Sequence, residues 1–209
     1  MRIIAAFTFI WTFPIFAHSQ DSIHVSRQGI SKGIFETKIS DDLIYNRAIE
    51  WVNKTYQNPD KVLTGKVPNK SLNLNGYASN SFYYKSLGIA YFYNTSYGIY
   101  ITIDKGRVEF IFDEKKHTVS GTGATAMFDS QSWFKEDGEY RKAYNSAKET
   151  YENTINNLWF SLINTITSTE ISSDEALAQL KKAKDKLDLG LITQDEFDKI
   201  KAELTPFIK

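Results

Sequence analysis

The spacing of apolar residues is clearest in the middle of the chain. In the segment 98–104, isoleucines at every second position alternate with polar or aromatic residues, and in the segment 107–113 valine and phenylalanine do the same. Successive side chains of a strand point to opposite faces, so this pattern predicts antiparallel strands with one packed face. The turn Asp104-Lys105-Gly106 joins the two segments, which together predict a β-hairpin.

Weaker strand patterns surround this hairpin. These segments are rich in β-branched and aromatic residues, and turn-forming residues separate several of them. Together with the hairpin they predict one antiparallel sheet. The further expected strands are 33–39, 61–67, 71–78, 87–95 and the glycine-rich 117–125.

Two helices are predicted by apolar residues that recur at steps of three and four. The first begins at Ser40-Asp41-Asp42 and ends near Asn58-Pro59. The second runs from Tyr140 to Ile166 with no Pro or Gly inside. A helix this long is expected to lie across the sheet and cover it. The stripe of the first helix consists of Ile44, Ala48, Trp51, Val52 and Thr55.

The last forty or so residues predict a helical hairpin with a well-specified turn. Gly190 suits the left-handed residue that ends a helix. Thr193 and Glu196 have the spacing of a capping box, and Ile192 with Phe197 has that of the hydrophobic staple around it. Two helices this short are only marginally stable alone, so the hairpin is expected to dock on something. We expect these five residues to form an interaction site.

The N-terminus has the pattern of an export signal. A basic start precedes the apolar run 3–16, and Ala17-His18-Ser19 offers small residues at the two positions that a signal peptidase reads. We expect a signal peptide over 1–19, cleavage between Ser19 and Gln20, and a mobile leader over 20–32. The apolar run is shorter than the roughly 20 residues of a spanning helix. The mature chain is therefore expected to be exported, periplasmic or secreted, without a transmembrane span.

Composition and charge narrow the function. The chain has 209 residues, of which 25 are basic and 25 acidic, and no cysteine. A chain with no net charge has no long-range field to attract nucleic acid, which is not an expected partner. Without disulfides an exported protein depends on its core, to which 14 Phe, 12 Tyr and 4 Trp contribute.

Few residues offer chemistry. His117 follows Asp113 and Glu114, but a zinc site needs three or four converging ligands, so a charged turn between strands is the favoured interpretation. With no Cys and no well-placed His, a nucleophilic triad is not expected. The run 121–126 lacks the lysine of a phosphate loop and is interpreted as a strand whose small side chains let the long helix approach. We expect no catalytic residue, no metal and no cofactor.

A tyrosine-rich stretch is the most ambiguous surface. Alternate positions face opposite sides of a sheet, so some of the rings are expected to leave the core. An exposed aromatic face can hold an apolar ligand, a glycan or a protein partner. Packing beneath the helices is the alternative that we favour. The stretch consists of Tyr83, Tyr84, Tyr91, Phe92, Tyr93, Tyr97 and Tyr100. The possible aromatic surface is formed by Tyr91, Tyr93, Tyr97 and Tyr100.

Two segments of the main region carry a resemblance to a known family. The first is Ile49-Glu50-Trp51-Val52 in the expected helix, and the second is 100–110, which consists of a strand, a Lys-Gly turn and a second strand. They resemble a family of exported bacterial proteins of unknown function with a fold like that of the TATA-box-binding protein. The resemblance covers about 33–168 and implies no catalytic residue. The fold alone implies no DNA binding.

The C-terminal hairpin carries a more specific resemblance. Its pattern is that of the short C-terminal domain called SHOCT. The resemblance implies tethering or self-association rather than an activity. The matching residues are Leu187, Gly190, Leu191, Ile192, Thr193, Glu196, Phe197, Lys201 and Leu204.

These observations predict an α+β protein. An antiparallel sheet, TBP-like or helix-grip-like, is covered by two helices over 33–168, one of them long, and a helical hairpin follows over 172–209. We expect a non-catalytic binding or assembly protein of the bacterial envelope, with a protein partner or self-association through the hairpin. The alternative is a domain that binds a small apolar ligand in a cavity between the sheet and the long helix. A sizeable enclosed pocket would distinguish the two.

Overall fold

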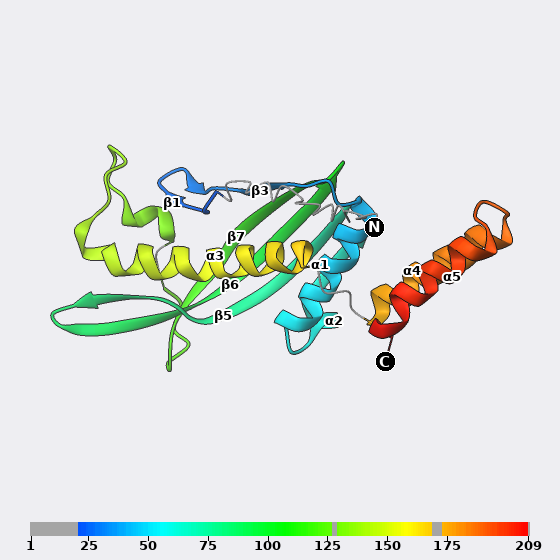
Figure 1. Ribbon diagram of the computed structural model, residues 1–209. Coiled ribbons are helices and arrows are strands. Elements are labelled where there is room, and N and C mark those ends of the chain that lie inside the picture. Colours follow the sequence, from blue (N-terminus) through cyan, green and yellow to red (C-terminus); the bar gives the residue numbers. More distant parts are fainter. Residues whose placement is uncertain (1–20, 127–128, 169–172, 209) are drawn as a thin grey trace, which may run out of the picture.

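A computed structural model describes residues 21–126, 129–168 and 173–208. A five-stranded antiparallel sheet in the order β3-β7-β6-β5-β4 forms its centre, and helix α3 lies across the sheet (Figure 1). The α+β class and the antiparallel sheet expected from the sequence are confirmed. The main elements are β3 (Gly33–Glu36), α1 (Asp41–Thr55), α2 (Pro59–Val62), β4 (Leu63–Val67), β5 (Ser71–Ser86), β6 (Ile89–Asp104), β7 (Arg107–Val119), α3 (Asn145–Thr167), α4 (Ser173–Asp188) and α5 (Gln194–Leu204).

The hairpin of β6 and β7 has the register that the alternation predicts. Ile99 pairs with Phe112, and Ile101 with Phe110, and all four side chains are buried on the face that α3 covers. The segments expected as separate short strands are parts of two long ones, because β5 and β6 each continue for 16 residues.

No helix of the described residues is long and apolar enough to cross a membrane.

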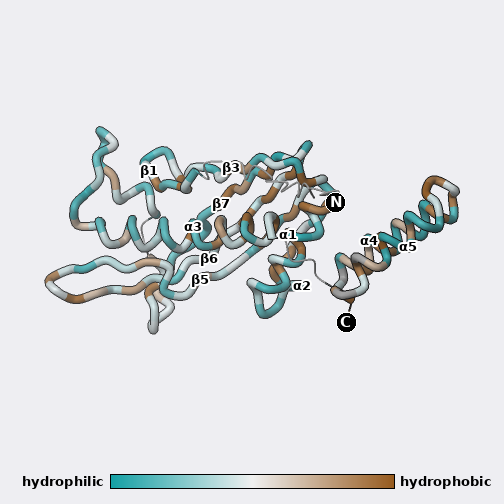
Figure 2. The backbone as a smooth tube through the Cα atoms, in the orientation of Figure 1, coloured by the Kyte–Doolittle hydropathy of each residue, from teal (hydrophilic) through white to brown (hydrophobic). Residues whose placement is uncertain are grey.

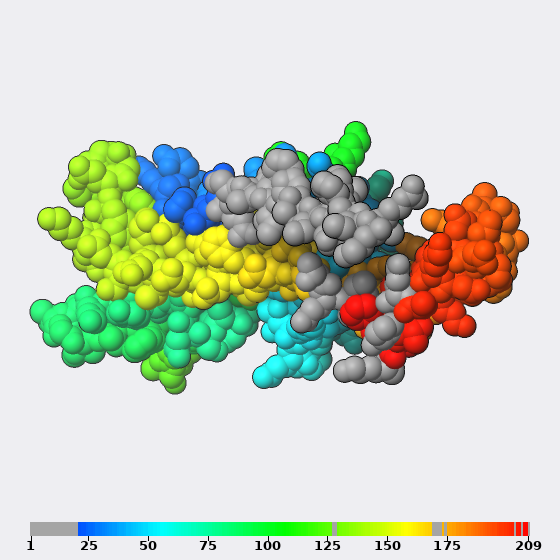
Figure 3. Space-filling model, viewed as in Figure 1, coloured from blue at the N-terminus to red at the C-terminus, as the bar shows by residue number. Residues whose placement is uncertain are grey.

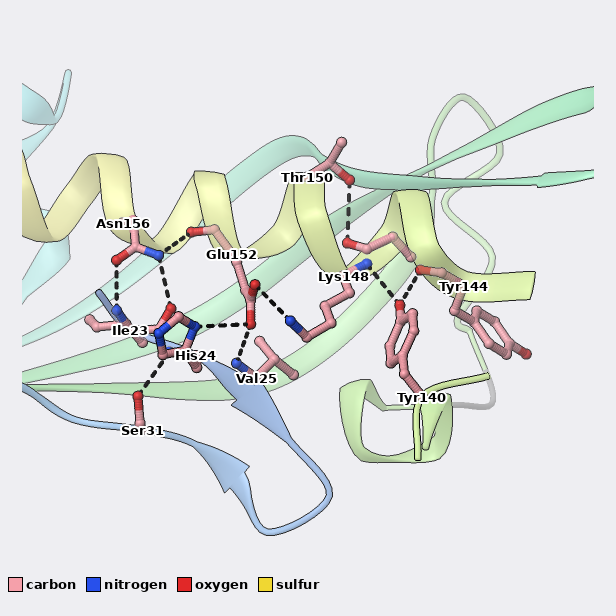
Figure 4. A network of polar contacts seen from close by, with 11 residues as sticks. Ile23, His24, Val25, Ser31, Tyr140, Tyr144, Lys148, Thr150, Glu152 and Asn156 are labelled. Atoms are coloured by element: carbon pink, nitrogen blue, oxygen red, sulfur yellow. Dashed lines mark hydrogen bonds and ion pairs between the residues drawn. The ribbon is translucent and has the colours of Figure 1, made fainter. Parts of the chain in front are cut away.

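The two expected helices are present with shifted ends. α1 is capped by Ser40, whose side chain accepts from the Leu43 N–H, and it ends at Thr55 because Tyr56 is extended. Thr55 is exposed, so the apolar stripe is one residue shorter than predicted. Tyr140 precedes α3 instead of starting it, and its hydroxyl accepts from the Lys148 N–H (Figure 4).

The segment predicted as a mobile leader is packed against α3, which corrects that prediction. Ile23 and Val25 are buried in the main core. The backbone of Ile23 donates to Asn156 Oδ1 (2.7 Å) and accepts from Asn156 Nδ2 (2.9 Å), and Val25 N donates to Glu152 Oε1 at 2.7 Å (Figure 4). The segment then forms a small hairpin, β1 (Val25–Ser26) with β2 (Gly29–Ile30).

The glycine-rich strand expected over 117–125 is wrong beyond Val119. β7 ends there, and a turn returns the chain so that Thr125 bridges Thr118. Gly121 and Gly123 have φ of +85° and +70°, which suits a turn and not a strand. A Cβ on either glycine would meet nothing within 4 Å. The prediction that these small residues let the long helix approach is therefore wrong.

Candidate functional site

The turn of the C-terminal hairpin has the geometry that its sequence predicts. Gly190 ends α4 with φ +66°, and the Leu191 N–H returns to the Lys186 carbonyl at 2.8 Å. Thr193 and Glu196 form the capping box: the Thr193 N–H donates to Glu196 Oε2 (2.8 Å), and the Glu196 N–H donates to Thr193 Oγ1 (3.3 Å). The turn is therefore a built structure.

The apolar residues that this turn exposes most lie outside the five residues expected to form the interaction site. Ile192 and Phe197 are half-buried. Leu189 and Leu191, on either side of Gly190, are 73% and 70% exposed. Figure 2 shows an apolar segment at this end of the hairpin. The sequence indicates this exposure, because a leucine beside the glycine of a tight turn has few residues of its own helix to pack against.

A buried ion pair docks the hairpin on the main region. Arg47 of α1 donates through Nη1 to the Ile166 carbonyl at 2.6 Å and through Nη2 to Glu175 Oε1 at 3.3 Å. The side chains of Arg47 and Glu175 are 9% and 6% exposed. Nearer the solvent, Lys182 pairs with Asp42. Arg47 lies beside the apolar stripe of α1. An arginine at such a position indicates a buried acidic partner, because arginine is rarely buried unless it is paired.

Removing the hairpin is expected to leave the main region folded. The buried apolar residues described in α4 and α5 lie outside the main core cluster; they are Ala176, Ala183 and Leu204. Truncation also returns Arg47 to water, where an unpaired guanidinium costs little. A chain ending at Ser168 should therefore keep one cooperative thermal transition by circular dichroism. A broad melt without a transition would show that the hairpin completes the main core.

The four tyrosines proposed as an aromatic surface do not share one. Tyr93 and Tyr97 are buried on the inner face of β6, in line with Ile99. Tyr100 lies on the opposite face and is partly exposed, and Tyr91 is partly exposed near the free end of the strand. The packing alternative was therefore right for two of the four rings, and the proposed surface is wrong as a unit.

A buried polar chain crosses from β5 to β7, and the sequence argument missed it. Ser81 Oγ lies 2.6 Å from Thr95 Oγ1, which lies 2.9 Å from His117 Nδ1. His117 Nε2 is 3.3 Å from Glu114 Oε2, and Glu114 Oε1 accepts from the Ser130 N–H at 2.9 Å. The interpretation of His117 as part of a charged turn was wrong, because the residue is buried within β7.

Two strand irregularities bring this chain together. Tyr97 pairs with Glu114 and Ser96 with Lys116, so Lys115 is an extra residue in β7. A bulge of this kind reverses the alternation, which places Glu114 and His117 on the same face although they are three residues apart. Ser81 lies within a second irregularity, between Ala78 and Phe82, and its side chain is buried.

The buried polar chain of Ser81, Thr95, His117 and Glu114 resembles a hydroxyl–imidazole–carboxylate relay, but its hydroxyl groups are closed to solvent. Thr95 is 0% exposed and Ser81 2%. Burial alone raises the pKa of Glu114, and the contact with His117 and the Ser130 N–H outweigh it, so the pKa lies below its ordinary value of 4.5. A charged Glu114 thus holds β7 to the short helix at 130–133. Within the described residues, no group of three His, Cys, Asp or Glu is placed to hold a metal.

Two clefts of the described surface border the buried polar residues and helix α4. One of about 430 Å³ borders the polar chain, with Glu114, His117 and Gln131 in its wall. One of about 490 Å³ lies between α1 and α4. Beneath α3, aromatic rings fill the space: Phe82 and Tyr151 have centroids 5.4 Å apart, and Phe110 and Trp159 are 5.5 Å apart.

The described residues define the class of this chain as an α+β protein with an antiparallel sheet and a long helix. In particular, the chain is similar to a DUF4468 family protein from Bacteroides ovatus, with a TM-score of 0.43, 11% identity, and coverage of 66% of this chain and 85% of that one. It is also similar to a TBP-like protein from Parabacteroides distasonis, with a TM-score of 0.46, 11% identity, and coverage of 67% and 93%. Likeness at this level carries no inference about function.

No protein-family model and no curated protein matches the sequence. The resemblance of the hairpin to SHOCT therefore remains an expectation from its residues.

Proposed function

We propose that this chain is an exported, non-catalytic binding or assembly protein of the bacterial envelope, with the C-terminal hairpin as its interaction or tethering module. The observation that carries the proposal is the pair of leucines at the hairpin turn, Leu189 and Leu191, which are more than two thirds exposed. The capping box and Gly190 hold these side chains in place, so little ordering entropy is lost when a partner covers them. The apolar run 3–16 supports export.

Two further observations support binding at a surface. The rings beneath α3 leave the sheet and helix in direct contact, which supports surface recognition over the alternative of an apolar ligand in a cavity there. The hydroxyls of the buried polar chain are closed to solvent, which supports a structural role for it. The proposal therefore assigns no catalytic residue and no cofactor.

Replacing both turn leucines by serine is expected to abolish self-association or partner capture while the protein stays folded. These side chains pack on little within the chain, so their loss should shift the melting temperature by no more than about 2 °C. Sedimentation of the purified protein over a concentration series, together with capture from envelope extracts, measures the change. Val67→Ser, on the exposed edge of β4, is the matched control, because Val67 is 49% exposed.

Variants of the turn geometry give an independent test of the same site. Thr193→Ala should cost the hairpin about 1 kcal/mol through loss of the cap. Gly190→Val forces a branched residue to φ +66° and should cost more. Both should weaken association and leave the main-region transition unchanged. If the wild type and all variants are monomeric and capture no partner, the proposal is wrong.

A further inference from the structure

The hairpin of β5 and β6 continues past the end of β7 as a two-stranded arm, defined here as residues 82–93 (Figures 1 and 3). β7 ends at Val119, which pairs with Tyr93, so within the described residues no third strand accompanies the arm beyond that point. At its base Phe82 is buried and stacks on Tyr93 at 5.0 Å. At its tip Leu87 is 99% exposed and Ile89 58%. The arm and the C-terminal hairpin lie at opposite ends of the molecule (Figure 1).

A collar of aromatic rings surrounds the arm just behind its tip. Tyr83 pairs across the strands with Phe92, at a centroid distance of 5.4 Å, and Tyr84 pairs with Tyr91 at 5.5 Å. Neighbouring residues of a strand face opposite ways, so one ring pair lies on each face of the ribbon. Tyr91 and Phe92 are both partly exposed.

The tip itself is built against local preference. Leu87 and Gly88 have φ of +48° and +81°, the two positive values of a tight hairpin turn that favours Asn-Gly. A leucine at the first position is strained there. Because Leu87 is almost fully exposed, no packing within the chain compensates for the strain. An apolar residue kept at such a position points to a contact outside the chain.

Charge distinguishes between kinds of partner. Over residues 71–103 the one charged side chain is Lys85, which lies between the collar and the tip. The arm has apolar side chains at its tip, aromatic rings next to the tip and a lysine that can reach phosphate. Segments that enter a lipid interface have this arrangement. From the collar to Leu87 is three residues, or about 10 Å, which matches the depth to which interfacial segments bury.

We propose that the tip of the arm, residues 86–90, inserts into the interfacial layer of a phospholipid bilayer. The collar then lies at the level of the headgroups, and Lys85 contacts their phosphates. This inference deepens the proposed function by assigning a partner to the second end of the molecule, and it rests on that function for the membrane that an envelope protein would meet. The hairpin remains available for a protein partner, because it lies at the other end.

The test uses vesicles of phosphatidylcholine alone and of phosphatidylcholine with phosphatidylglycerol, sedimented with the purified mature protein. Wild type should sediment with the vesicles, and more strongly when they are anionic. The double variant Leu87→Asn with Ile89→Thr should reduce the bound fraction about tenfold or more, because two apolar side chains no longer leave water. Asn suits the turn, so the variant should fold as well as the wild type. Val67→Ser, at a valine that is 49% exposed and pairs with Ser71 at the other end of β5, should bind like the wild type.

A label at the tip reports insertion directly. The chain has no cysteine, so Leu87→Cys and Leu189→Cys each create a unique site for an environment-sensitive fluorophore. The label at position 87 should shift to the blue on adding anionic vesicles, and the label at position 189 should not. Wild type that stays in the supernatant with both vesicles, or a double variant that binds equally, overturns the proposal. Self-association through the hairpin is measured without lipid and does not depend on the vesicle experiment. A failure of the hairpin's proposed role can therefore be distinguished from a failure of membrane binding.

Discussion

Gly106→Ala should be the most damaging conservative substitution in the β6–β7 hairpin, with a loss of about 3–5 kcal/mol of unfolding free energy. Gly106 has φ +79°, and a Cβ at that position would lie 2.1 Å from the Thr37 carbonyl oxygen, a backbone atom that cannot rotate away. The Gly106 carbonyl also accepts from the Thr37 N–H at 2.8 Å. The Gly106 N–H in turn donates to the Asp41 carboxylate at 2.7 Å. Displacing the turn therefore disturbs β3 and the start of α1 together.

Gly123→Ala is the matched control for that experiment. Gly123 has φ +70°, but a Cβ there meets nothing within 4 Å. The control thus carries the conformational penalty without the clash and should cost about 1–2 kcal/mol. Urea unfolding followed by tryptophan fluorescence measures both. Equal losses for the two variants would contradict the role assigned to the close approach of Thr37.

Glu114→Gln should weaken the protein at neutral pH and flatten its response to acid. At neutral pH we expect a loss of about 2 kcal/mol, because the charged hydrogen bond from Ser130 and the contact with His117 both weaken. The folded-state pKa of Glu114 is lower than its unfolded value of 4.5, so its contribution is complete above that value. The contribution is lost as the pH falls through the folded pKa.

The measurement is the unfolding free energy of wild type and variant from about pH 6 to about pH 3. Wild type should lose stability more steeply than Glu114→Gln as the pH falls below 4.5. Glu36→Gln, a change to a carboxylate whose side chain is 61% exposed, should keep the wild-type slope. Parallel curves for wild type and Glu114→Gln would show that the buried pair does not govern acid stability.

Regular periodicity predicted the parts of this fold that are regular. The alternation at Ile99 and Phe110 gave the register of the central hairpin, and the three-and-four spacing through Trp159 gave the long helix. The same alternation places Tyr93 and Tyr97 on the buried face, because each is an even number of residues from Ile99.

Other features follow from irregularities that a sequence pattern does not reveal. The extra residue at Lys115 reverses the alternation of β7, so the inward direction of His117 depends on a bulge that no residue type announces. The N-terminal segment has only Ile23 and Val25 in alternation, too few to distinguish a strand from a polar leader. The Arg47–Glu175 pair joins residues 128 positions apart, and only the folded chain brings them together.

The contacts of the N-terminal segment with α3 set an order for folding. Ile23 bonds to Asn156 across 133 residues of sequence, and Trp159 donates to the Asp21 carbonyl across 138. Closing loops of this length is entropically costly, and neither contact exists until α3 has been made. Ile23 therefore enters the core only after nearly the whole main region has left the ribosome. A polypeptide that cannot complete its core early remains extended for longer, which is the form in which the proposed export would carry it across a membrane.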